Sequence, residues 1–109
     1  MPRDEIPPGT LYMLILRTLF RGQELHGYQI ARSIQQVSGD VLQVEEGSLY
    51  PALQRMLIKG WITAKWGTTV DNRRARYYRL TAAGRKQLET EVSRYNRVMH
   101  AILLVIETA

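Results

Sequence analysis

The chain has 109 residues, with 15 lysines and arginines against 10 aspartates and glutamates, and no cysteine. This length allows one domain with a modest core, and a content of 45% hydrophobic and 23% charged residues is typical of a folded globular protein. We expect a cytoplasmic protein without disulfides, thiolate metal sites, a signal peptide or a membrane span, because the sequence lacks cysteine and long apolar runs.

Two helices are expected in the first forty residues. An N-terminal tail over residues 1–9 ends in Pro7-Pro8-Gly9, and Thr10 can cap a first helix that Gly22 ends. A second helix is expected from His26-Gly27, with Gly39 placed to end it in a left-handed conformation. The apolar positions of both helices recur at helical spacing: Leu11, Leu14, Ile15, Leu16, Leu19 and Phe20 in the first, and Ile30, Ala31, Ile34 and Val37 in the second.

A third helix is expected from Ser48 or a residue or two earlier. Glu45 and Glu46 suit a helix N-terminus, and Pro51 is compatible with a first turn, where amides have no intrahelical partner. The expected inward face consists of Leu49, Leu53, Met56 and Leu57. The opposite face carries hydroxyl, amide, aromatic and basic groups, namely Ser48, Pro51, Gln54, Arg55 and Lys59, with Tyr50 at its edge. Such a face suits base edges and phosphates, but it also suits water.

The pattern changes after Gly60 to an alternation typical of strands. Ile62, Ala64 and Trp66 alternate with polar residues, and Tyr78 and Leu80 do so later, on either side of a polar connection over residues 67–74. Most of the excess positive charge lies between residues 61 and 81, where Asp71 is the only acid among Lys65, Arg73, Arg74, Arg76 and Arg79. A localised basic segment is typical of a polyanion binder, although a solvated arginine-rich loop has the same composition.

A long last helix is expected over residues 82–109, capped by Thr81. Its apolar residues recur at alternating steps of four and three: Leu88, Val92, Tyr95, Met99, Ile102 and Ile106. At 1.5 Å per residue such a helix would reach about 42 Å, which is longer than a small domain can cover. These residues are therefore expected to form a homodimer interface, the alternative being that the helix packs back on its own core.

Together these elements predict a mainly α (α+β) fold. Three helices followed by a basic hairpin are the order of a winged helix-turn-helix domain, here over residues 10–81, with a two-stranded wing. The third helix would be the recognition helix, and residues 82–109 would form the C-terminal dimerisation helix.

Three segments, in this order and spacing, resemble the PadR family of bacterial transcriptional regulators. They are Leu25-His26-Gly27-Tyr28, then Glu46-Gly47-Ser48-Leu49-Tyr50-Pro51-Ala52-Leu53, then Arg73-Arg74-Ala75-Arg76-Tyr77-Tyr78-Arg79-Leu80-Thr81-Ala82-Ala83-Gly84. The resemblance implies a winged-helix homodimer that binds double-stranded DNA and usually represses a nearby promoter. The chain resembles the short subgroup, which has a single C-terminal helix.

The resemblance also implies which residues contact DNA. The recognition helix would enter the major groove. Base discrimination would then rest mainly on Gln54 and Arg55, because a glutamine amide suits adenine and an arginine guanidinium suits guanine. The groove-facing residues would be Ser48, Tyr50, Pro51, Gln54, Arg55 and Lys59. The wing would reach phosphates or the minor groove through Arg73, Arg74 and Arg76. Tyr28 is expected to contact a phosphate, unless it is a half-buried aromatic.

Some short members of that family bind planar drugs between aromatic rings at the dimer interface. Here the last helix has no tryptophan, and Tyr95 is its only aromatic residue. Trp61 and Trp66 belong to the wing region and are expected in the core. A small-molecule effector therefore has no support in the sequence, and no cofactor or metal is expected.

The sequence leaves two alternative functions. A winged helix can also serve as a protein-interaction module without specific DNA binding, and a basic wing does not exclude an acidic protein partner. An enzyme is disfavoured, because His26 and His100, the only histidines, lack metal-ligand spacing and no nucleophile is paired with a base.

Overall fold

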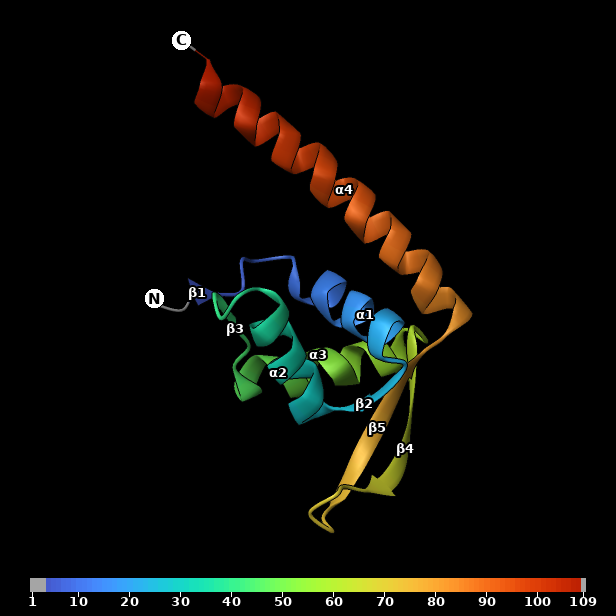
Figure 1. Cartoon of the computed structure of the whole chain (residues 1–109). Helices are drawn as coiled ribbons and strands as arrows, with labels where there is room; N and C mark the ends of the chain where they lie inside the picture. Colours follow the sequence, from blue (N-terminus) through green and yellow to red (C-terminus); the bar gives the residue numbers. More distant parts are fainter. Residues whose placement is uncertain (1–3, 109) are drawn as a thin grey trace.

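A computed structural model describes residues 4–108 of the chain. The helices are α1 (Leu11–Gly22), α2 (Gly27–Val37), α3 (Glu46–Ile58) and α4 (Ala82–Glu107), and the strands are β1 (Asp4–Glu5), β2 (Glu24–His26), β3 (Leu42–Gln43), β4 (Ile62–Thr68) and β5 (Arg74–Leu80). Three helices form a body from which the β4–β5 hairpin and α4 project in different directions (Figure 1). This confirms the predicted winged helix-turn-helix fold with a long C-terminal helix.

The core lies among α1, α2, α3 and the base of the hairpin. Helix α1 is central, because it contacts α2, α3, α4 and β5. The core residues are Ile15, Leu16, Leu19, Ile30, Ile34, Leu49, Ala52, Leu53, Met56, Ile62, Tyr78 and Leu88. Burial of these apolar side chains is the main favourable term that holds the three helices together.

The hairpin belongs to a three-stranded antiparallel sheet in the order β2-β5-β4. In the register, Trp66 of β4 faces Arg76 of β5, and His26 of β2 faces Tyr77. The sequence pattern predicted β4 and β5 but missed β2, which has only three residues and runs directly into α2. It also missed a second small sheet, in which β1 pairs in parallel with β3.

The predicted helix ends are mostly confirmed. The Nδ1 of His26 accepts a hydrogen bond from the backbone N–H of Gln29, whose side chain accepts one from the His26 backbone N–H, so α2 begins with a capping box. Thr81 caps α4 by accepting from the N–H of Gly84. Gly39, which follows the C-cap residue Ser38 of α2, has the expected left-handed conformation with φ of +67°.

Two details of the predicted helix starts are wrong. Thr10 occupies the N-cap of α1, but its hydroxyl donates to the carbonyl of Pro7 instead of capping the helix. Helix α3 begins at Glu46, two residues before Ser48 and within the predicted range, but Pro51 is its sixth residue and lies beyond the first turn. Pro51 therefore has no N–H to donate to the carbonyl of Gly47.

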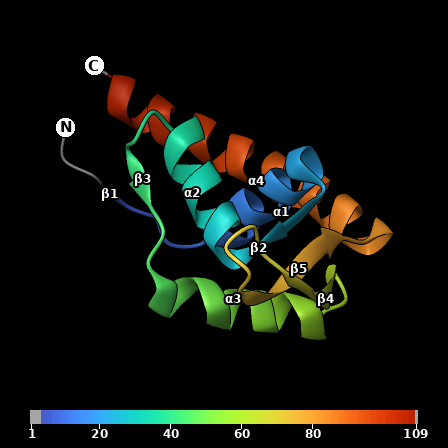
Figure 2. The same ribbon diagram turned by 60° about the horizontal axis from the view of Figure 1, so that its bottom comes forward.

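Helix α4 extends away from the body in Figure 1, while Figure 2 places α3 and the hairpin on the side of the body opposite α4. The described residues span 57 × 34 × 22 Å. None of the four helices combines the length and the apolarity needed to span a bilayer.

Candidate nucleic-acid interface

Helix α3 buries one face and exposes the other, as its sequence predicts. Leu49, Leu53 and Met56 are buried, and Leu57 is half-buried. The predicted groove-facing residues are all exposed: Ser48, Tyr50, Pro51, Gln54, Arg55 and Lys59. Ile58, 76% exposed, lies on the same face, although the sequence analysis did not single it out.

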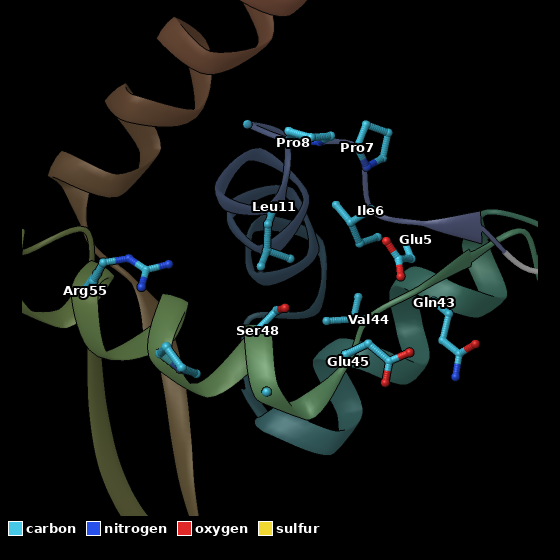
Figure 3. A pocket seen from close by; sticks show the side chains of 13 residues that line it. Glu5, Ile6, Pro7, Pro8, Leu11, Gln43, Val44, Glu45, Ser48 and Arg55 are labelled. Carbon is cyan, nitrogen blue, oxygen red and sulfur yellow. The ribbon is translucent and has the colours of Figure 1, made fainter.

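Five of the six predicted groove-facing residues of α3 line two different hollows. Tyr50 and Gln54 line a cleft of about 920 Å³ between α3, the N-terminal turn of α2 and the inner face of the hairpin. Ser48, Pro51 and Arg55 line a second hollow of about 510 Å³. Figure 3 shows this second hollow between the N-terminal segment and the first turns of α3. We call the first of these the wing cleft.

The wing cleft is strongly basic. Its lining, drawn from the described residues, includes one acid, Asp71, and four arginines, Arg32, Arg73, Arg74 and Arg76. The second hollow is mixed in charge, because Glu5 and Glu45 line it together with Arg55. Of the two, the wing cleft is the one that suits a polyanion.

Trp66 lies on the inner face of the hairpin and is not in the core, so that prediction is wrong. Its side chain is 57% exposed. The guanidinium carbon of Arg74 lies 4.3 Å from the centre of its ring, and that of Arg76 lies 5.7 Å away. Both distances are in the range of cation–π contacts. Trp61 is half-buried and packs against the core, as predicted.

Tyr28 and Arg32 form the opposite wall of the wing cleft. Tyr28 is 61% exposed, and Arg32 donates a hydrogen bond of 3.2 Å from Nη1 to the Tyr28 hydroxyl. Tyr28 is therefore not a half-buried aromatic, and the sequence analysis missed Arg32. The sequence did indicate Arg32, because it lies four residues after Tyr28 and residues four apart on a helix share a face.

Tyr78 lies at the bottom of the wing cleft, near Tyr50. Burial raises the pKa of the Tyr78 hydroxyl above the ordinary value of 10.0, and Arg76 partly opposes the rise, while Tyr50 adds to it. Along the inner face of the sheet, the buried phenol of Tyr78 is therefore followed by the exposed Trp66 ring, which has the guanidinium groups of Arg74 and Arg76 over it.

Arg55 and Lys59 are held away from the wing cleft by aromatic neighbours. The Nε of Arg55 donates a hydrogen bond of 2.6 Å to the hydroxyl of Tyr12, and its guanidinium lies over the same ring. The ammonium of Lys59 lies 5.3 Å from the centre of the Trp61 ring. Gln54 and Tyr50 are left as the exposed side chains of α3 with hydrogen-bonding groups at the wing cleft, and of the two only Gln54 carries an amide.

The predicted interface residues of α4 divide at Glu91. Leu88 is only 7% exposed and belongs to the core of its own chain, which contradicts the prediction that it contacts a partner. Beyond Glu91, Met99 is half-buried, and the exposed large apolar residues are Val92, Tyr95, Val98, Ile102, Leu103, Leu104, Val105 and Ile106. This unpartnered apolar surface follows the predicted seam and widens towards the C-terminus.

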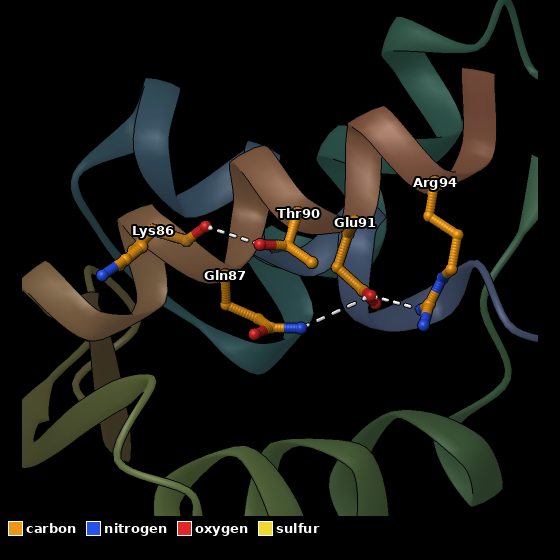
Figure 4. Close-up of polar contacts among 5 residues, drawn as sticks. All are labelled: Lys86, Gln87, Thr90, Glu91 and Arg94. Carbon is orange, nitrogen blue, oxygen red and sulfur yellow. Dashed lines mark hydrogen bonds and ion pairs between the residues drawn. The ribbon is translucent and has the colours of Figure 1, made fainter. Parts of the chain in front are cut away.

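Glu91 marks the end of the part of α4 that packs on the body. Its carboxylate is buried and is bound by Arg94, and by Gln87 with a hydrogen bond of 3.4 Å (Figure 4). A buried carboxylate needs such partners, because an unpaired charge out of water is costly. Within residues 4–108, no group of histidine, aspartate and glutamate side chains could hold a metal ion.

Comparisons with known proteins agree with this geometry. Residues 15–90 match the Transcriptional regulator PadR-like family. The uncharacterized protein X of Lysinibacillus sphaericus is 32% identical over 107 residues, which cover 98% of this chain and 97% of that protein.

Solved structures give the same result. A transcriptional regulator from Clostridium thermocellum matches with a TM-score of 0.82 and 25% identity over 91% of this chain and 95% of its own. A PadR family transcriptional regulator from Eggerthella lenta matches with a TM-score of 0.78 and 25% identity, over 93% and 85% of the two chains. The chain belongs to the PadR-like family of transcriptional regulators.

Proposed function

We propose that this protein is a sequence-specific repressor that binds duplex DNA as a homodimer, on an operator that is an inverted repeat. The wing cleft is the observation that carries the proposal. It places four arginines, the exposed Tyr28 and the amide of Gln54 around one concave, basic surface next to a recognition helix.

Phosphate contacts are assigned to the hairpin and to the N-terminal turn of α2. Arg73, Arg74 and Arg76 would bind the backbone or enter the minor groove, and Tyr28 would bind a phosphate beside Arg32. Each neutralised phosphate releases counterions, so this part of the affinity depends steeply on salt. Such contacts position the protein but carry no sequence information.

Base reading is assigned mainly to Gln54. A glutamine amide can bind the N6 and N7 atoms of adenine in a bidentate manner, which is worth about 1–3 kcal/mol of discrimination. The Nε of Arg55 is already used by the hydrogen bond to Tyr12, so only its outer nitrogens could reach guanine. We therefore assign Arg55 and Lys59, together with Ser48, Tyr50 and Pro51, to the edge of the interface.

The homodimer is assigned to α4. The exposed stripe of Val92, Tyr95, Ile102 and Ile106, with the half-buried Met99, has the spacing of a helix that packs lengthwise on a second helix. A two-fold axis along this seam would present two recognition helices to successive major grooves, roughly 34 Å apart. Two-fold symmetry in the protein requires an inverted repeat in the operator.

Repression would follow from occupancy, because a dimer bound across a promoter excludes polymerase from the same DNA. This step rests on the resemblance to PadR regulators, many of which repress. The proposal includes no catalytic step, cofactor or effector, and it places the protein in the cytoplasm with its DNA.

The test is a titration of the purified protein, over a range of salt concentrations, into a fluorescent duplex of its own promoter region and a scrambled control. Tight promoter binding in dimer steps, with a steep salt slope, supports the proposal. Equally weak binding to both duplexes contradicts sequence specificity. No binding even at low salt contradicts DNA binding and favours a protein-interaction module with an acidic partner.

A further inference from the structure

The exposure of the Trp66 ring to water is unfavourable, so a tryptophan at this position suggests a specific role. More than half of its surface is exposed, on the inner face of the hairpin beyond the end of the core. A smaller polar residue would keep the strand pairing without exposing an indole to water. The contacts of the ring indicate this role, because the guanidinium groups of Arg74 and Arg76 both lie over it.

We propose that Trp66 is a positioning residue that holds Arg74 and Arg76 as a preorganised phosphate clamp on the wall of the wing cleft. This inference rests on the proposed DNA-binding function. The register supports it, since Trp66 and Arg76 are direct cross-strand partners and Arg74 is two residues away on the same face.

The chemistry of the stack favours phosphate binding. A guanidinium that lies parallel over an indole contacts it with the face of its planar group, and its N–H donors then remain in the plane at the edge. Those edges are the part that forms bidentate hydrogen bonds with phosphate oxygens. The Nε of Arg76 is already buried and has no hydrogen-bond partner among the described residues, which leaves its outer nitrogens to meet the ligand.

Preorganisation lowers the entropic cost of binding. A free arginine side chain loses much of its rotamer freedom when it binds a phosphate. With both side chains already restricted by Trp66, less freedom is lost on binding. The indole itself neutralises no phosphate, so its removal is expected to weaken binding without changing the number of counterions released.

The experiment compares Trp66→Ala, Trp66→Phe and Arg74→Ala, with Thr63→Ala on the same strand as a control, by anisotropy of a fluorescein-labelled promoter duplex across a salt series. Trp66→Ala is expected to lose affinity about five- to tenfold with an unchanged salt slope. Trp66→Phe is expected to recover most of that loss. Arg74→Ala is expected to reduce the slope by about 1.

A second readout does not depend on DNA. In a Trp61→Phe background Trp66 is the only tryptophan, and Arg74→Ala is expected to shift its emission to the red as the ring gains water. If the emission of Trp66 is the same with and without Arg74, the contact between the two side chains is contradicted. If Trp66→Ala binds the promoter duplex with wild-type affinity, or if its salt slope falls as in Arg74→Ala, the positioning role alone is overturned. If the wild-type protein does not bind the duplex at all, the proposed function is overturned as well.

Discussion

The phenol of Tyr50 in α3 lies directly against Gly27 at the start of α2. A Cβ placed on Gly27 would stand 2.7 Å from the Tyr50 hydroxyl oxygen and 2.8 Å from its Cε1. This close approach joins the two helices of the helix-turn-helix and fixes Tyr50 at the edge of the wing cleft. The glycine is thus required by the position of a neighbouring side chain.

Gly27→Ala is expected to displace the Tyr50 ring without unfolding the protein. The atoms in conflict form the end of a side chain that is 47% exposed, so the ring can turn outwards. We expect the free energy of unfolding to change by less than about 1 kcal/mol, while affinity for the promoter duplex falls several-fold. Thermal melts and anisotropy measure the two effects. In a Tyr50→Ala background Gly27→Ala should have no further effect on affinity, and a remaining effect would contradict this account.

Gly84→Ala is expected to be severely destabilising, because the atom in conflict belongs to the backbone. A Cβ on Gly84 would stand 2.0 Å from the carbonyl oxygen of Trp61, which also accepts the hydrogen bond from the Thr81 N–H. Backbone at this junction cannot move without breaking that bond, so we expect a loss of about 2–4 kcal/mol in the free energy of unfolding. Urea denaturation measures it. Gly47→Ala is the matched control, since nothing lies within 4 Å of a Cβ there, and equal losses would contradict the argument.

Local signals in the sequence were sufficient to predict most of the fold. The start of α2 at His26, the left-handed Gly39 and the cap at Thr81 each depend on a few neighbouring residues. The same is true of the strand alternation in β4 and β5. The short strands β1 and β2 were not predictable in this way, because each is defined by a partner strand distant in sequence.

The candidate site was predictable as a set of residues but not as an arrangement. Alternation places Trp66 on the same face of the hairpin as Ile62, yet it does not show where along that face the core ends. Helical periodicity places Arg55 on the outer side of α3, yet its partner Tyr12 lies 43 residues earlier. The extent of the core decides the role of Trp66, and a contact between residues distant in sequence decides that of Arg55.

Gln54→Ala is expected to reduce discrimination between promoter and random DNA while leaving affinity for random DNA unchanged. The lost hydrogen bonds to a base correspond to about 1–3 kcal/mol on the promoter duplex only. Competition titrations with both duplexes measure the ratio. The exposed Gln36 on α2, which lies outside the wing cleft, provides the control Gln36→Ala. Equal losses on both duplexes would assign Gln54 to the phosphate backbone instead.

Tyr78→Phe is expected to make the protein less sensitive to alkaline pH. Because burial raises the pKa of Tyr78 in the folded state, its neutral phenol contributes stability that is fully present below pH 10.0, the ordinary pKa of the unfolded chain. Above that pH the unfolded tyrosine loses its proton before the folded one does. Stability then falls by up to about 1.4 kcal/mol per pH unit until the folded pKa is reached. Urea melts of both proteins at about pH 9 and 11 measure this loss, and an equal decline in the two would rule out Tyr78 as its source.

Ile102→Lys is expected to convert the proposed dimer into monomers. Ile102 lies in the exposed stripe of α4, 44% exposed in the single chain, and a lysine there would have to be buried without a partner in the predicted seam. Sedimentation or light scattering measures the mass, with His100→Lys, a change at an exposed position off the seam, as the control. Each monomer would retain its wing cleft but would engage one half-site, so affinity for the inverted repeat should fall towards that for a single half-site. A variant that stays dimeric would place the interface on another surface of the protein.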